Sequence, residues 1–150
     1  MTETVGALAV AAAMLALAVA RLAWGALCLD ASSPDRLVAE LRLAQVAALL
    51  LVLAAGTYAG AAVASRTPGA GLDIALATGF FVVAALATTR APGRALTVLA
   101  AAWGAHGLVG LGHQTGALPP GVVPGWYATA SAIYAVCMAG ICYLPNLRQR

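Results

Sequence analysis

Both histidines of the chain lie in one apolar, glycine-rich stretch, residues 101–116, with the sequence AAWGAHGLVGLGHQTG. His106 and His113 are seven residues apart, so a helix places them on nearly the same face, two turns and about 10 Å apart. A carboxylate beside an imidazole fixes its tautomer and raises its basicity, which is how general acid–base pairs are built. Asp73, at the start of the preceding segment, is expected at the depth of His113. We therefore predict three candidate catalytic residues: a pair of Asp73 and His113, and a deeper His106, with Trp103 lining the same pocket.

The sequence predicts neither a metal nor another cofactor. Two histidines about 10 Å apart cannot chelate one ion, and the chain has no third histidine. A haem with two axial histidines would need a facing partner from an oligomer. Cys28, Cys137 and Cys142 show no CxxC spacing, so free, packed cysteines are expected.

A second polar cluster is expected in the opposite leaflet, formed by Arg21, Glu40, Arg42 and Gln45. Its two helices are joined by a short connector and are expected to be neighbours, so Arg21 can reach Glu40 by extending its stem. Arg36 and Arg42 are expected at the lipid headgroups. Two interpretations stay open: a buried ion pair that holds two helices in register, or a ligand site for an anionic headgroup or carboxylate anchored by Arg21.

The amino-acid composition indicates whether these clusters lie in a water-soluble protein or in a lipid bilayer. The chain is 63% hydrophobic and only 9% charged, with a mean hydropathy of +0.93, whereas a soluble domain carries about a quarter charged residues. Such a chain cannot solvate its own surface in water, so we expect an integral membrane protein. The net charge of +3 is too small and scattered for a nucleic-acid-binding patch.

Five segments are apolar enough to cross a bilayer, which takes about 20 residues each. Ser33 before Pro34 predicts a helix N-cap with proline at the first helical position. Gly56 and Gly60 form a GxxxG match, which we expect to support internal packing, with a homodimer interface as the alternative. The fold class is thus an all-α integral membrane protein, a single bundle of five transmembrane helices, over residues 5–29, 37–64, 72–89, 95–112 and 126–144.

Arginine positions predict the orientation. With five spans, one side of the membrane holds only Arg66, and the other holds Arg36, Arg42, Arg90, Arg94, Arg148 and Arg150. The positive-inside rule then places the N-terminus outside and the C-terminus in the cytoplasm, in a bacterial cytoplasmic (inner) membrane.

Three functions stay open. The first is binding of a hydrophobic or amphipathic small molecule (lipid, quinone or isoprenoid-like) in a polar pocket between the helices, with an accessory-subunit role in a larger assembly as one form of it. The second is a bilayer-embedded acid–base enzyme, an isomerase, cyclase or hydrolase of an isoprenoid- or lipid-like substrate, in which Asp73 orients His113. The third is an oligomeric pore with Arg21 and Glu40 facing its axis.

The sequence contains no P-loop, GxSxG or HExxH motif that would select another chemistry. The expected partners are membrane lipids and a hydrophobic small molecule, without nucleic acid, and a homo-oligomer or larger membrane complex stays open.

Overall fold

The computed structural model describes residues 2–65, 68–119 and 122–147. Within these residues the regular secondary structure consists of five α-helices. The prediction of an all-helical chain with five helices long and apolar enough to span a membrane is confirmed. Each observed helix end lies within three residues of its predicted position. The helices are α1 (Thr2–Leu27), α2 (Pro34–Ser65), α3 (Ala70–Thr88), α4 (Pro92–Thr115) and α5 (Gly125–Leu147).

The helix ends follow from local chemistry. The Asp35 amide donates a hydrogen bond to Ser33 Oγ at 3.2 Å, which confirms the predicted N-cap of α2. α3 begins after Gly69, with φ 97°, and α4 ends at Gly116, with φ 76°. Both angles lie in the left-handed region that glycine adopts without steric cost. These two glycines reverse the chain on either side of the α3–α4 pair.

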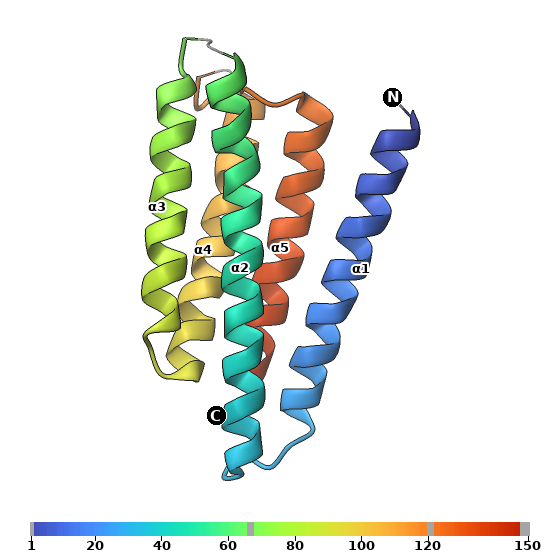
Figure 1. Cartoon of the computed structure of the whole chain (residues 1–150), viewed down its shortest axis with the longest axis vertical. Helices are drawn as coiled ribbons and strands as arrows, with labels where there is room; N and C mark the ends of the chain where they lie inside the picture. The colour runs from blue at the N-terminus through green and yellow to red at the C-terminus, as the bar shows by residue number, and fades with distance from the viewer. Residues whose placement is uncertain (1, 66–67, 120–121, 148–150) are drawn as a thin grey trace.

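Successive helices run in opposite directions, so every connection lies at one of the two ends of the bundle (Figure 1). We call the end that holds Asp73 and His113 the histidine end; it is where α3 begins and α4 ends. The opposite end, which holds Arg36 and Arg90, is the arginine end. The up-and-down order thus brings the first turn of α3 beside the last turn of α4.

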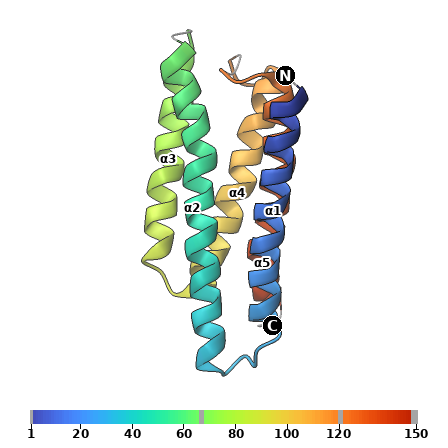
Figure 2. The same cartoon turned by 45° about the vertical axis from the view of Figure 1, so that its right-hand side comes forward.

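α2 pairs with α3 and α4 pairs with α5, and α1 lies against α2 and α5 at the side of the bundle (Figure 2). α1 is close to the other helices near the arginine end and diverges from them toward the histidine end (Figure 1). Its buried side chains, Val19, Ala23 and Ala26, all lie in its second half. In its first half Val10 and Met14 are 65% and 64% exposed. The side chains of this half of α1 line a groove between α1 and its two neighbours.

Large apolar side chains cover the outside of the bundle. Exposure exceeds 60% at residues on four helices, including Leu17, Leu49, Leu108 and Ile133. A soluble monomer rarely exposes contiguous apolar surface on this scale. A helix bundle in a bilayer presents such a surface to the lipid tails, and its backbone groups are all paired inside the helices.

The interior consists mainly of alanine, with Trp103 as the largest fully buried side chain. The Trp103 indole N–H donates to the Ala47 carbonyl oxygen of α2 at 3.3 Å. Small residues let helix backbones approach closely, which is how helices associate in lipid. The contact between α4 and α5 depends on two glycines of α4. A β-carbon at Gly107 would lie 3.3 Å from the Ala132 carbonyl oxygen, and one at Gly110 would lie 3.2 Å from the Ala128 carbonyl oxygen.

The expectation that Gly56 and Gly60 support internal packing is wrong. A β-carbon built at either glycine meets no atom of another helix within 4 Å. The two glycines of the GxxxG match therefore do not bring helices of this chain together, and Gly107 and Gly110 do.

We predict that the double substitution Gly107→Ala/Gly110→Ala separates α4 from α5 and lowers the free energy of unfolding by about 1–3 kcal/mol, as overpacking typically does. The measurement is reversible unfolding in mixed micelles, followed by circular dichroism. Gly104→Ala is the matched control, because a β-carbon there meets nothing within 4 Å. Alanine favours a helix over glycine by about 1 kcal/mol, so the control should be at least as stable as the parent. Equal stability of the double variant and the control would contradict the packing argument.

Candidate functional site

Asp73 and His113 meet at the histidine end, as the sequence predicts. Asp73 lies in the first turn of α3 and His113 in the last turn of α4. His113 Nε2 is 3.0 Å from Asp73 Oδ1, and the two side chains are only 5% and 2% exposed. The two atoms are at ion-pair distance, but they are not aligned as a hydrogen bond requires. Their catalytic role stays a prediction.

The other ring nitrogen determines the tautomer of His113. His113 Nδ1 lies 2.6 Å from the carbonyl oxygen of Pro119. A carbonyl oxygen can only accept, so Nδ1 carries a proton and donates it. Two arrangements of the pair follow. In one, Nε2 also carries a proton and faces the Asp73 carboxylate; in the other, Nε2 carries no proton and faces Asp73 as a carboxylic acid. In both arrangements the pair is neutral overall with one proton between the two groups, which avoids an uncompensated buried charge.

His106 lies two turns deeper in α4 and is 4% exposed. Three aromatic rings surround its imidazole edge to face: Phe80 at a centroid distance of 5.1 Å, Tyr58 at 5.5 Å and Trp103 at 6.0 Å. His106 Nε2 lies 3.5 Å from Ser131 Oγ of α5, a long and weak contact. The prediction that His106 lies beside Trp103 is confirmed.

A small cavity joins Asp73 to His106. Its volume for water centres is about 10 Å³, which is room for about one water molecule. The three predicted catalytic residues therefore come together, but around a space too small for a lipid or isoprenoid substrate. Side chains of α2, α3 and α4 fill the rest of this region; the lining consists of Ala55, Tyr58, Asp73, Leu76, Ala77, Phe80, His106 and Val109.

At the arginine end, Glu40 pairs with Arg36. Arg36 Nε donates to Glu40 Oε1 at 2.9 Å, one turn along the same helix. Arg36 Nη2 also donates to the Pro145 carbonyl oxygen of α5 at 3.1 Å. Glu40 therefore faces the interior of the bundle. The expectation that Arg36 lies at the lipid headgroups is wrong, because it is 3% exposed and fixes α2 to the C-terminal end of α5.

The remaining residues of that predicted cluster, Arg21, Arg42 and Gln45, are exposed on the surface of α1 and α2. The structure does not gather them with Glu40 into one pocket, and their role in ligand binding stays a prediction. The sequence feature that could have predicted the Arg36–Glu40 pair is the spacing of four residues, because this spacing places two side chains of opposite charge side by side on a helix.

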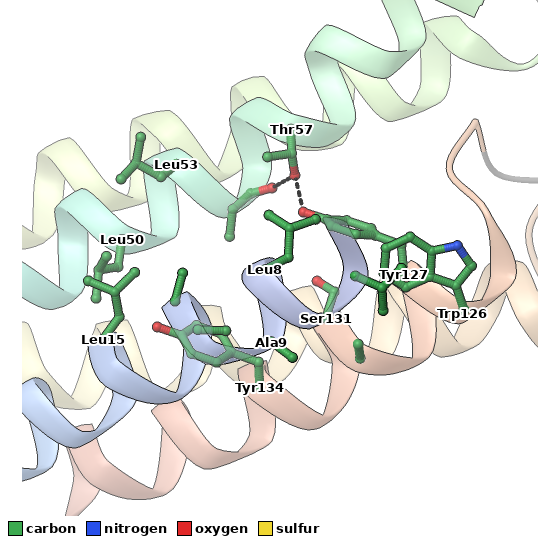
Figure 3. A pocket seen from close by; sticks show the side chains of 15 residues that line it. Leu8, Ala9, Leu15, Leu50, Leu53, Thr57, Trp126, Tyr127, Ser131 and Tyr134 are labelled. Carbon is green, nitrogen blue, oxygen red and sulfur yellow. Dashed lines mark hydrogen bonds between the residues drawn. The ribbon is translucent and has the colours of Figure 1, made fainter. Parts of the chain in front are cut away.

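A groove lies between the first half of α1 and the facing parts of α2 and α5, with a volume of about 320 Å³ (Figure 3). The groove is where α1 diverges from its neighbours. Its lining is almost entirely apolar, including Leu8 and Leu15 of α1 and Leu50 and Leu53 of α2. Sequence reasoning missed this site, because no polar motif marks it.

Four hydroxyl-bearing residues interrupt the apolar lining: Thr57 on α2 and Tyr127, Ser131 and Tyr134 on α5. Thr57 Oγ1 donates to the Ala54 carbonyl oxygen at 2.7 Å and lies 2.7 Å from the Tyr127 hydroxyl (Figure 3). Because Thr57 has a single hydroxyl proton, Tyr127 is the donor in the second bond. The Tyr134 hydroxyl has no hydrogen-bond partner among the described residues. The polar part of the groove lining is therefore the bonded pair of Thr57 and Tyr127 hydroxyls, together with Ser131, whereas the Tyr134 hydroxyl itself is buried.

Ser131 belongs to both sites. It lines the groove between α1, α2 and α5, and its hydroxyl contacts His106 on the other side. Ser131 lies at this position because α5 packs closely against Gly107 and Gly110 of α4. Ser131 is therefore the point at which the polar interior meets the apolar groove.

Comparison of the chain with known protein families, with curated proteins and with solved structures finds no match. Within the described residues, no group of three or more histidine, cysteine, aspartate or glutamate side chains is placed to hold a metal ion.

We predict that Glu40→Leu lowers the free energy of unfolding by about 3–5 kcal/mol, because it leaves the buried Arg36 guanidinium without its carboxylate. The double variant Arg36→Met/Glu40→Leu, which removes both charges, should recover a large part of this loss. A double-mutant cycle measured by unfolding in mixed micelles gives the coupling between the two residues. Additive effects of the two single substitutions would contradict a coupled buried pair.

Proposed function

We propose that this chain is an integral membrane protein that binds one hydrophobic or amphipathic small molecule, of lipid, quinone or isoprenoid type, in the groove between α1, α2 and α5. The groove itself carries the proposal. Small-molecule sites typically have volumes of about 300–1,000 Å³ and combine an apolar lining with a few polar groups. The groove has a volume of about 320 Å³, with hydroxyls of Thr57, Tyr127, Ser131 and Tyr134.

The apolar exterior supports a location in a bilayer, since exposed leucine, isoleucine and valine side chains cover the outside of the bundle. All five arginines in the described residues lie toward the arginine end: Arg21, Arg36, Arg42, Arg90 and Arg94. By the positive-inside rule this end faces the cytoplasm and the N-terminus lies outside. We propose the bacterial inner membrane as the location.

The position of the hydroxyls gives the orientation of the ligand. Thr57, Tyr127 and Trp126 lie where α2 ends and α5 begins, so the polar part of the groove is toward the histidine end. Leu15 and Leu50 line its deeper part. A molecule with a hydrogen-bonding head and an apolar body matches this gradient, with the head between Thr57 and Tyr127 and the body toward the middle of the bundle.

The groove also supports entry from the lipid phase. It lies at the side of the bundle, between a peripheral helix and its two neighbours (Figure 1). A ligand dissolved in the bilayer reaches it without crossing water. The acid–base enzyme that the sequence left open has no comparable space beside Asp73, where the cavity measures about 10 Å³.

We predict that the purified protein retains a stoichiometric hydrophobic compound and that Ala54→Phe abolishes its retention, because Ala54 lines the groove and a phenyl ring would fill it. Native mass spectrometry, followed by solvent extraction and identification of the compound, provides the measurement. The occupancy of Ala54→Phe should fall at least tenfold.

Ala85→Phe is the matched control, since Ala85 is exposed on α3, away from the groove. It should retain the compound at the level of the parent. Equal retention by both variants, or no bound compound in the parent, would contradict the proposed function.

A further inference from the structure

The cavity between α2, α3 and α4 is surrounded by polar atoms that lack hydrogen bonds. Neither oxygen of Asp73 nor His106 Nδ1 has a partner in hydrogen-bond geometry among the described residues. The Tyr58 hydroxyl lies close to Ser131 but is not aligned with it as a hydrogen bond requires. All three residues line the cavity. Each buried polar group left without a partner costs about 1–3 kcal/mol, and more if it is charged. Three helices thus each contribute such a group to one point in the interior.

The cavity is mostly apolar, but its size and the three polar groups in its lining match the requirements of a site for one buried water. Such a site needs about 10–15 Å³ for the centre of the molecule and two to four polar partners. The cavity offers about 10 Å³ and three polar partners, of which Asp73 is 2% and His106 4% exposed. A purely apolar cavity of this size would stay dry.

We propose that this cavity binds one water molecule, which bridges Asp73, His106 and Tyr58 and so connects the Asp73–His113 pair to the groove through Ser131. The water donates one hydrogen bond to the free carboxyl oxygen of Asp73. It donates the other to His106 Nδ1 and accepts one from the Tyr58 hydroxyl, which satisfies all three groups. His106 Nε2 then carries the ring proton and donates to Ser131 Oγ, 3.5 Å away.

The connected groups cross the bundle from the loop at the histidine end to the groove. They begin at the Pro119 carbonyl and pass through His113 and Asp73 to the water, and then through His106 to Ser131. The water site rests only on the cavity and its polar lining. The last connection, to a ligand beside Ser131, rests on the proposed function.

The test is nuclear magnetic resonance of protein labelled with ¹⁵N at histidine, delipidated and in detergent micelles. The chain has only two histidines, so His106→Gln assigns both sets of ring signals. In the parent protein we expect a cross-peak between the His106 ring protons and a slowly exchanging water, and an Nδ1 shift typical of an accepted hydrogen bond. Ala77→Val, which fills the cavity, should remove the cross-peak and shift His106 Nδ1 while the His113 signals stay in place.

Asp73→Asn keeps the shape of the side chain and serves as the second variant if Ala77→Val does not fold. It should shift the signals of both histidines, because the water transmits the change to His106. Thr78→Val is the matched control, because Thr78 follows Ala77 directly in α3 but lies on its exposed face, and it should shift neither set of signals.

The absence of a water cross-peak in the parent protein, with a His106 signal unaffected by Asp73→Asn, would overturn the proposal. Ala54→Phe separates this outcome from failure of the proposed function. It blocks the groove and leaves the cavity unchanged, so it should keep the water cross-peak whether or not the groove binds a ligand.

Discussion

The close approach of α4 to α5 at Gly107 and Gly110 is the constraint on which the rest of the structure depends. In a bilayer the lipid tails are as apolar as the helices, so association depends on van der Waals contact and on hydrogen bonds between helices. At these glycines the α5 carbonyls of Ala132 and Ala128 lie where side chains would otherwise stand. The same contact sets Ser131 beside His106 and leaves the α5 face with Tyr127 and Tyr134 turned toward α1.

Much of the fold was predictable because helices that can span a bilayer have a characteristic length and apolar composition, and this chain has five such helices. The five helices followed from runs of apolar residues and from breakers such as Pro34 and Gly116. The Asp73–His113 pair was predictable for a topological reason, because antiparallel neighbours place the start of one helix beside the end of the next. The depth of a residue along the bundle can therefore be predicted from the positions of the apolar runs in the sequence.

Lateral packing could not be predicted in the same way. The sequence predicts a pair of Glu40 with Arg21 and places Arg36 at the lipid headgroups. The rotation of α2 against α5 instead buries Arg36 under the Pro145 carbonyl, beside Glu40. Gly56 and Gly60 match a packing motif, yet no helix approaches them. The groove depends on the tilt of α1, which comes from contacts at Val19, Ala23 and Ala26 near one end. Each of these features depends on helix rotation or tilt, which apolar periodicity does not specify.

The two sites differ in the kind of contact that holds the helices around them. Buried polar contacts tie α3 to α4 through Asp73 and His113, and α2 to α5 through Arg36. Separating such partners inside the bundle would leave buried charged groups unpaired, which opposes movement of α3 away from α4 and of α2 away from α5. The first half of α1, by contrast, meets its neighbours through apolar side chains across the groove. Apolar contacts lack direction and can be exchanged for contacts with a lipid-like molecule at little cost. On the α2 and α5 side of the groove, Ser131 is the residue that both lines the groove and contacts His106 of the polar interior, so the ligand that we propose would contact the interior there.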